Sequence, residues 1–245
     1  MRYKNTAEIM LRRTRKKHVQ LSLDRARKPD GKHGGWRPGA GRKKKPGAVS
    51  HDSREDLPSR FPVHVTLRIV EGVGSLARDY LMKIIRKSIA ESHKSWFRIV
   101  EFNVLSNHLH LICEAQSKRQ LARGIQGFEV RTARRLNRVL KRTGKLFSQR
   151  YHVRQLKSPK EVRNALRYVL LNRKHHNAEQ KFAKFWIDPY SSAAWFTGWA
   201  GPINVTTDWK RELVEMPRPN AEATGWLLTT GWRRHGLLRF DEAPA

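Results

Sequence analysis

The chain has 245 residues and a formal net charge of +30, from 51 lysines and arginines against 21 aspartates and glutamates. Such an excess attracts polyanions, so we expect a nucleic acid partner and no small-molecule substrate. A single cysteine excludes an intramolecular disulfide, and no apolar run approaches the roughly 20 residues that cross a bilayer. The charged N-terminus is unlike a signal peptide. We therefore expect a cytoplasmic, nucleoid-associated protein without membrane contact.

Residues 1–55 are predicted to be a flexible basic arm. Large apolar side chains are scarce after Leu23, so the segment cannot bury enough surface to offset the entropy of ordering it. Residues 34–45 resemble an AT-hook, in which glycines bring the backbone close to the DNA minor groove while Arg37 and Arg42 enter its negative potential. The compact Gly-Arg-Pro core of that motif is absent, so a solvated basic linker is the alternative.

The next segment has the pattern of a globular domain. Apolar and polar residues alternate over 63–69, which predicts a half-buried strand. Apolar residues recur at helical spacing over 76–93, and residues 96–105 predict a second strand that a tight connection at 106–107 joins to a third. Strand, helix and hairpin in this order predict an α+β fold.

The third strand carries the most informative motif, Asn-His-Leu-His-Leu-Ile at 107–112. Side chains alternate along a strand, so His108 and His110 share one face while Leu109 and Leu111 share the other. Neutral imidazole is the commonest protein ligand of divalent metals, and a pair on a rigid strand leaves coordination positions open for a substrate oxygen. A pair lacks a third ligand, so two structural histidines are the alternative interpretation.

A long helix is expected over residues 117–142, with one apolar side. Arginines crowd the rest of its surface and Glu129 is nearly alone among them, whereas a solvated helix usually mixes signs. A phosphate backbone would relieve the repulsion, which favours a DNA contact over a plain soluble face. The predicted DNA-binding side chains of this helix are Arg123, Arg131, Arg134, Arg135, Arg138 and Arg142.

Residues 151–156 predict a further strand, and Ser-Pro-Lys-Glu at 158–161 predicts the start of a helix that runs to about residue 174. Serine can cap that helix, proline fits its first position and the glutamate completes a capping box. Tyr168 and Asn172 lie one helical turn apart, so a phenol and a carboxamide stand side by side at the flank of the apolar stripe. A tyrosine with its ring in the core and its hydroxyl at the rim is the alternative.

Four motifs, in this order and spacing, resemble those of the IS200-like tyrosine transposases, most closely the REP-associated members of bacteria. The motifs are Pro-Val-His-Val-Thr at 62–66, Asn-His-Leu-His-Leu-Ile at 107–112, Gly-Lys-Leu-Phe at 144–147 with Arg150-Tyr151, and Arg-Tyr-Val-Leu-Leu-Asn at 167–172. The similarity spans about residues 60–176. It implies a catalytic domain over residues 56–178 with the HUH endonuclease fold, an antiparallel sheet with helices packed mainly on one face.

The resemblance also implies a chemistry. His108, His110 and Asn172 would bind Mg²⁺ or Mn²⁺, and Tyr168 would be the nucleophile that cleaves and rejoins single-stranded or hairpin DNA through a 5′-phosphotyrosine intermediate. Members of the family commonly follow the asparagine with proline, which is absent here, so His175 becomes a rival third ligand if the helix continues. The runner-up function is a noncatalytic DNA- or RNA-binding regulator with the same fold.

Residues 179–245 form a predicted Trp-rich extension without net charge, which holds six of the eight tryptophans. These rings either stack on unpaired bases or clamp the extension onto the catalytic domain, and we prefer the clamp. The sequence leaves open whether the protein is a monomer or a homodimer.

Overall fold

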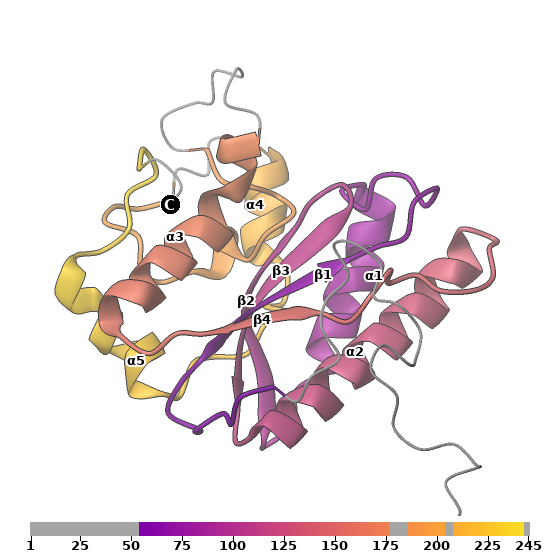
Figure 1. The fold of residues 1–245 in the computed structure, drawn as a ribbon. Coiled ribbons are helices and arrows are strands. Elements are labelled where there is room, and N and C mark those ends of the chain that lie inside the picture. The colour runs from indigo at the N-terminus through magenta and orange to yellow at the C-terminus, as the bar shows by residue number, and fades with distance from the viewer. Residues whose placement is uncertain (1–53, 177–185, 204–207, 243–245) are drawn as a thin grey trace, which may run out of the picture. The chain divides into compact units, whose positions relative to one another are not determined.

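The computed structural model describes residues 54–176, 186–203 and 208–242, so nearly all of the predicted basic arm, including Arg37 and Arg42, lies outside them. The described residues belong to one compact unit, Pro46–Ala245. At its centre is a four-stranded antiparallel sheet with the strand order β2-β3-β1-β4 (Figure 1). The strands are β1 (Val63–Arg68), β2 (Phe97–Val104), β3 (His108–Ala115) and β4 (His152–Gln155). The predicted α+β class with an antiparallel sheet is confirmed.

One face of the sheet is covered by α1 (Asp79–Ala90) and α2 (Lys118–Val139) (Figure 1). The alternation predicted for the first strand explains this, because Val63, Val65 and Leu67 are fully buried in the core beneath these helices. The residues between them, His64 and Thr66, point to the opposite face. β1 therefore separates an apolar face from a more polar one.

The opposite face carries α3 (Pro159–His176) and C-terminal segments (Figure 1). The expectation that helices pack mainly on one face holds for α1 and α2, but this second face is covered as well. A β-bulge between Ile99 and Glu101 lets Val100 enter a second core together with Ile112, and both side chains are almost completely buried. Apolar residues on both faces of β2 and β3 therefore require cover on both sides.

Local sequence signals fix the ends and the packing of α2. Ser117 caps the helix, because its hydroxyl accepts a hydrogen bond from the Gln120 backbone N–H at 3.3 Å. Gly124 allows the helix to approach the sheet closely, since a Cβ at this position would lie only 2.2 Å from the Phe97 ring. The helix ends before the predicted residue 142, because Lys141 has a left-handed backbone with φ of 49°.

The capping box predicted for α3 is confirmed. Ser158 Oγ accepts a hydrogen bond from the Glu161 backbone N–H at 3.3 Å, and Glu161 Oε2 accepts one from the Ser158 backbone N–H at 3.1 Å. This start sets the phase of α3, so that Val162, Leu166 and Val169 are buried against the second core. The same phase decides where Tyr168 and Asn172 point.

The C-terminal segments contain η1 (Ala193–Trp195), α4 (Asp208–Glu215), α5 (Trp226–Thr229) and η2 (Gly231–His235). They cover the outer edge of β2, where Val104 N–H donates to the Tyr190 carbonyl at 2.9 Å and Ala221 N–H donates to the Ile99 carbonyl at 2.9 Å. An open strand edge invites pairing with another chain. Here the chain itself occupies that edge at these positions.

Two tryptophans hold the C-terminal segments against α3. Trp232 and Trp199 are 1% and 8% exposed and lie in the second core, as the clamp interpretation predicts, whereas Trp226 is half exposed. A bidentate ion pair between Arg163 of α3 and Glu242, at 2.7 and 3.0 Å, closes the clamp. Among the described residues, no helix is long and apolar enough to span a membrane.

Candidate active site

The two histidines of β3 form the strand half of the site. His108 and His110 point to the α3 face, while Leu109 and Leu111 enter the core under α1 and α2, as the alternation predicts. The two imidazole rings meet edge to face with centroids 4.7 Å apart. His110 is only 4% exposed, and His108 is half-buried. The strand therefore presents two adjacent imidazoles, one of them deep in the structure.

Both ring nitrogens of His110 have a defined neighbour. His110 Nδ1 lies 3.1 Å from His64 Nε2 and 3.1 Å from Thr66 Oγ1, both on β1. His110 Nε2 lies 3.5 Å from the Tyr168 hydroxyl oxygen. A proton on Nδ1 satisfies the contact with β1 and leaves the Nε2 lone pair directed toward α3. That is the tautomer in which Nε2 can accept a proton or bind a metal.

Tyr168 forms the helix half of the site. Its ring packs against the second core and also contacts two imidazoles edge to face, with centroids 5.0 Å from His110 and 5.6 Å from His64. The alternative interpretation, a core tyrosine with its hydroxyl at the rim, describes the ring. It does not describe the hydroxyl, which faces the histidines. These contacts fix the direction of the phenol oxygen.

Asn172 follows Tyr168 by one turn of α3 and is fully buried. Neither its Oδ1 nor its Nδ2 has a hydrogen-bond partner among the described residues. α3 continues to His176, as the missing proline allows, so His175 lies on the helix too, but its side chain is outside the described part of the chain. The choice between Asn172 and His175 as third metal ligand stays a prediction.

Burial shapes the electrostatics of this face. Desolvation, with a smaller contribution from the charge of Arg154, lowers the pKa of His64 to about 4. His64 is therefore neutral at pH 7, and its Nε2 can accept a hydrogen bond from His110 Nδ1. A neutral neighbour also adds no positive charge beside a site that is expected to hold a cation.

The residues present fit a divalent cation. No group of three His, Cys, Asp or Glu side chains within the described ranges could hold a metal ion. A site built on His108 and His110 therefore needs the carboxamide of Asn172 as its third ligand. The amide oxygen is a donor that suits Mg²⁺ and Mn²⁺, and the two imidazoles supply nitrogen donors. A buried polar atom without a partner costs about 1–3 kcal/mol. A cation that binds Asn172 Oδ1 would remove this cost for the oxygen.

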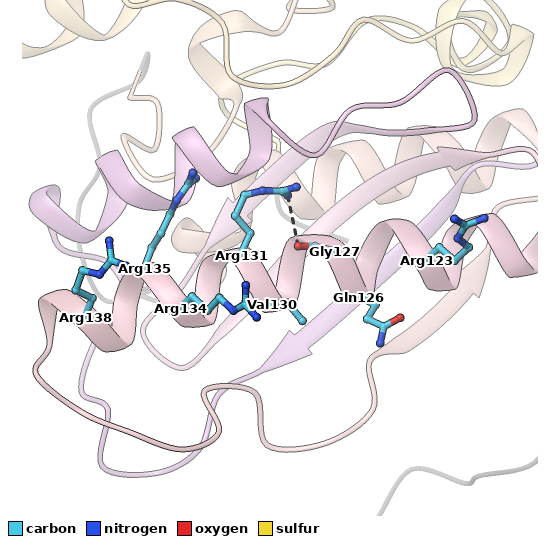
Figure 2. Close-up of a pocket in the computed structure, with 8 residues that line it drawn as sticks. All are labelled: Arg123, Gln126, Gly127, Val130, Arg131, Arg134, Arg135 and Arg138. Atoms are coloured by element: carbon cyan, nitrogen blue, oxygen red, sulfur yellow. Dashed lines mark hydrogen bonds between the residues drawn. The ribbon is translucent and has the colours of Figure 1, made fainter. Parts of the chain in front are cut away.

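A second feature is a hollow of about 600 Å³ along α2, which we call the arginine groove (Figure 2). It is lined by five of the six arginines predicted to bind DNA from the long helix, together with three uncharged residues. The lining residues are Arg123, Arg131, Arg134, Arg135, Arg138, Gln126, Gly127 and Val130.

The arginines of the groove differ in how far their charge is neutralised. Arg131 and Arg135 share Glu91, at 3.5 and 2.5 Å, and the hydrogen bond from Arg135 lowers the pKa of that carboxyl. Arg134 and Arg138 are exposed and form no ion pair with any acid in the described ranges. Their charges are thus available to an external anion.

Arg142 does not line the groove. Its guanidinium donates to Asn137 Oδ1 at 2.7 Å and to the Lys145 carbonyl at 2.9 Å, which braces the turn at Gly144. The Arg142 guanidinium is therefore hydrogen-bonded within the chain, and its contact with DNA stays a prediction. Arg142 does not lie with the other five arginines because α2 ends three residues before it, at Val139.

Residues 64–172 match the sequence model of a family described as IS200-like transposases. This segment of the chain is therefore similar to the IS200-like transposases. A search of curated proteins found no match. Among solved structures, a chain described as a REP-associated tyrosine transposase bound to a REP hairpin is similar, with 16% sequence identity, coverage of 72% of this chain and 99% of that chain, and a TM-score of 0.49.

The IS200-like domain contains site residues that the sequence did not single out. His64 and Thr66 face His110 from the neighbouring strand, in a register that pairs Thr66 with His110. Alternation in the motif at 62–66 places these two side chains on one face, but only the strand pairing shows that this face meets the histidine pair. Asn103 pairs with His110 from the other side. Such register is not visible in one sequence.

Proposed function

We propose that this IS200-like transposase domain cleaves and rejoins single-stranded DNA with the help of a divalent metal. The observation that carries the proposal is the Tyr168 hydroxyl, 3.5 Å from His110 Nε2 and fixed by ring contacts to two histidines. A nucleophilic oxygen beside a metal-binding imidazole pair is the arrangement that covalent phosphoryl transfer needs. The substrate we expect is single-stranded or hairpin DNA.

In each step of the proposed reaction, one bond between phosphorus and oxygen forms and another breaks. The Tyr168 oxygen attacks the scissile phosphorus and loses its proton, while the bond from phosphorus to the 3′ oxygen breaks and that oxygen gains a proton. The products are a 5′-phosphotyrosine and a free 3′-OH. A second 3′-OH then attacks the phosphotyrosine and restores the tyrosine, so the strands join without an external energy source.

The chain's own groups position these atoms. His64 and Thr66 hold His110 through its Nδ1, and the His110 ring in turn orients the phenol. His108, His110 and Asn172 are the residues that would hold Mg²⁺ or Mn²⁺. When bound, the cation would polarise a nonbridging oxygen of the scissile phosphate.

The arginine groove would supply affinity for the DNA backbone. It lies on α2, and α2 covers the face of the sheet opposite to His110 and Tyr168. A phosphate bound in the groove is thus separated from the phenol by the sheet itself. We propose that the groove holds a duplex part of the DNA, such as a hairpin stem, while a single strand reaches Tyr168.

The arginine groove also favours the alternative function, a noncatalytic regulator that binds DNA or RNA. Its exposed charges attract a phosphate backbone whether or not any bond is broken. A regulator of this kind would bind nucleic acid with the same salt dependence but would form no covalent adduct.

Substitution of the proposed nucleophile tests the enzyme directly. The full chain is incubated with labelled hairpin DNA that carries a single-stranded flank, in Mn²⁺, and the denaturation-resistant adduct is measured and mapped by peptide mass. Tyr168→Phe should abolish the adduct and leave DNA affinity unchanged, because it removes one oxygen. The matched control is Tyr80→Phe, on the exposed side of α1. An adduct that survives Tyr168→Phe contradicts the proposal, and its absence from the wild type favours the regulator.

A further inference from the structure

Asp188 is a buried carboxylate that lies outside the segment matched by the transposase family. It is 0% exposed, in the chain that follows α3. Its Oδ2 accepts a hydrogen bond from Asn103 Nδ2 at 3.0 Å, and its Oδ1 accepts one from the Tyr190 backbone N–H at 2.9 Å. Arg173 Nε lies 3.0 Å from the same Oδ1. A buried carboxylate with three such partners is held in one position.

These contacts connect Asp188 to both halves of the candidate site. Asn103 on β2 is the direct cross-strand partner of His110 on β3. Directly opposed residues of antiparallel strands have Cβ atoms about 5 Å apart, so the Asn103 side chain lies beside the His110 side chain. Arg173 follows Asn172 on α3. One carboxylate thus ties the strand that carries a histidine to the helix that carries Tyr168 and Asn172.

The unsatisfied polar atoms of the site lie next to these two anchors. Asn103 Oδ1 and both side-chain polar atoms of Asn172 are buried and have no hydrogen-bond partner in the described part of the chain. Because Asp188 accepts from the amide nitrogen of Asn103, the Asn103 oxygen is turned away from Asp188. Buried oxygens left without a partner are expected where a ligand completes the set.

The segment around Asp188 is itself fixed to the domain. Arg86 of α1 donates to the Pro189 carbonyl at 2.6 Å, and the Tyr190 hydroxyl donates to Asp79 Oδ1 at 2.9 Å. The Tyr190 carbonyl accepts from the Val104 N–H on the edge of β2 at 2.9 Å. Asp188 is therefore presented from a segment that is docked independently of the ion pair with Arg173.

We propose that Asp188 is a positioning residue of the candidate metal site, through which the C-terminal segment sets the arrangement of His110 and Asn172. Asp188 touches neither the substrate nor the metal. It acts through Asn103 on the strand side and through Arg173 on the helix side. The inference rests on the proposed function of the site, and it makes part of the extension an integral component of that site rather than only a clamp.

The test measures Mn²⁺ binding to the full chain without DNA, by electron paramagnetic resonance of free Mn²⁺. Asp188→Asn keeps the shape and loses the charge that holds Arg173, so Mn²⁺ affinity should fall about 10–100-fold, as for other supports of metal ligands. Hairpin affinity without metal should be unchanged, because the arginine groove is untouched. Cleavage should be restored in part when Mn²⁺ is raised to saturate the weakened site.

Two control variants separate positioning from a general hold on the C-terminal segments. Tyr190→Phe removes the contact with Asp79 from the same segment, and Glu242→Gln weakens the ion pair with Arg163. Both should keep wild-type Mn²⁺ affinity. Should Asp188→Asn fail to fold, Asn103→Ala provides the second variant, because it removes the amide that Asp188 holds and keeps the ion pair with Arg173; it too should weaken Mn²⁺ binding.

The inference is overturned if Asp188→Asn or Asn103→Ala binds Mn²⁺ like the wild type, or if Tyr190→Phe and Glu242→Gln lose as much affinity as Asp188→Asn. Failure of the proposed function has a different signature, because the wild type itself would then neither bind Mn²⁺ nor form an adduct. An effect of Asp188→Asn on hairpin affinity equal to its effect on Mn²⁺ would also contradict a positioning role.

Discussion

The two faces of the sheet treat polar groups in opposite ways. On the α3 face, His110, Asn172 and Asn103 are buried, and polar atoms of the two asparagines have no hydrogen-bond partner among the described residues. On the α2 face the interior is apolar, and the charged groups stand outside the helix in the arginine groove. Under the proposed function, the α3 face carries out the cleavage chemistry and the α2 face supplies affinity for DNA.

The pKa values follow burial more closely than they follow the face, since burial also raises the pKa of Glu129 on α2 to about 7. On the α3 face desolvation disfavours charge, lowering the pKa of His64 to about 4 and raising that of Glu101 to about 8. On the α2 side, the Arg135 hydrogen bond lowers the pKa of the exposed Glu91 carboxyl and keeps it ionised. Buried groups that avoid charge suit a site that receives a cation and a phosphate, whereas exposed charges suit a DNA backbone.

The largest expected effect separates chemistry from affinity by substitution on the α3 face. His108→Ala and His110→Ala should each lower the cleavage rate by more than about 100-fold, because each removes a proposed metal ligand, while hairpin affinity changes by less than about threefold. Cleavage is measured on labelled hairpin DNA in Mn²⁺, and affinity by fluorescence anisotropy without metal. Exposed His235 supplies the control, His235→Ala, which should behave as wild type. If His108→Ala and His110→Ala lowered cleavage and hairpin affinity equally, the two faces of the sheet would not have separate roles.

The sequence predicted those elements whose signals are local. Strand alternation placed His108 and His110 on one face, and the Ser158–Glu161 capping box set the start of α3 correctly. Helical spacing then placed Tyr168 and Asn172 one turn apart. These predictions depend on periods of two and 3.6 residues, which are properties of the chain itself.

The parts that the sequence could not give depend on pairing between distant segments. His64 meets His110 only through the register of β1 with β3, and Asp188 meets Asn103 only because the C-terminal chain docks on the edge of β2. The cover on the α3 face was underestimated for a related reason. A bulge that admits Val100 to the second core breaks the simple alternation from which a face is inferred.

A second, smaller effect is expected on the α2 face. The double substitution Arg134→Gln and Arg138→Gln should lower the log–log salt slope of duplex binding by about 1.8, at about 0.9 per lost phosphate contact, which is about tenfold in affinity between 50 and 200 mM salt. The cleavage rate at saturating DNA should not change, because the sheet separates the groove from Tyr168. Anisotropy across a salt series gives the slope.

The control for the arginine groove removes the same charge from elsewhere on the surface. Arg119 and Lys141 are exposed at the two ends of α2 and do not line the groove. The double variant Arg119→Gln and Lys141→Gln should therefore change the slope less than the groove variant does. If both pairs lower it equally, the chain attracts DNA through its net charge alone, and the groove has no special role.

Substitution of Glu101 is expected to change folding stability and to have the smallest effect on DNA cleavage. It tests whether the α3 face disfavours charge. Glu101 is buried beside Ser192, and burial raises its pKa to about 8, whereas a glutamate in an unfolded chain titrates near 4.3. Between these values the folded protein binds a proton that the unfolded chain releases. Stability from this proton is present at low pH and is lost as the pH rises from about 4.5 to 8. The free energy of unfolding should therefore fall by a few kcal/mol between pH 5 and pH 9.

Glu101→Gln cannot ionise, so this pH dependence should disappear and the variant should be more stable than the wild type above pH 8. Urea unfolding at pH 5, 7 and 9 measures the difference, with Glu215→Gln, on the exposed side of α4, as the control. Parallel pH profiles for wild type and Glu101→Gln would show that this face accepts a charge, and the contrast between the two faces would then rest on the arginine groove alone.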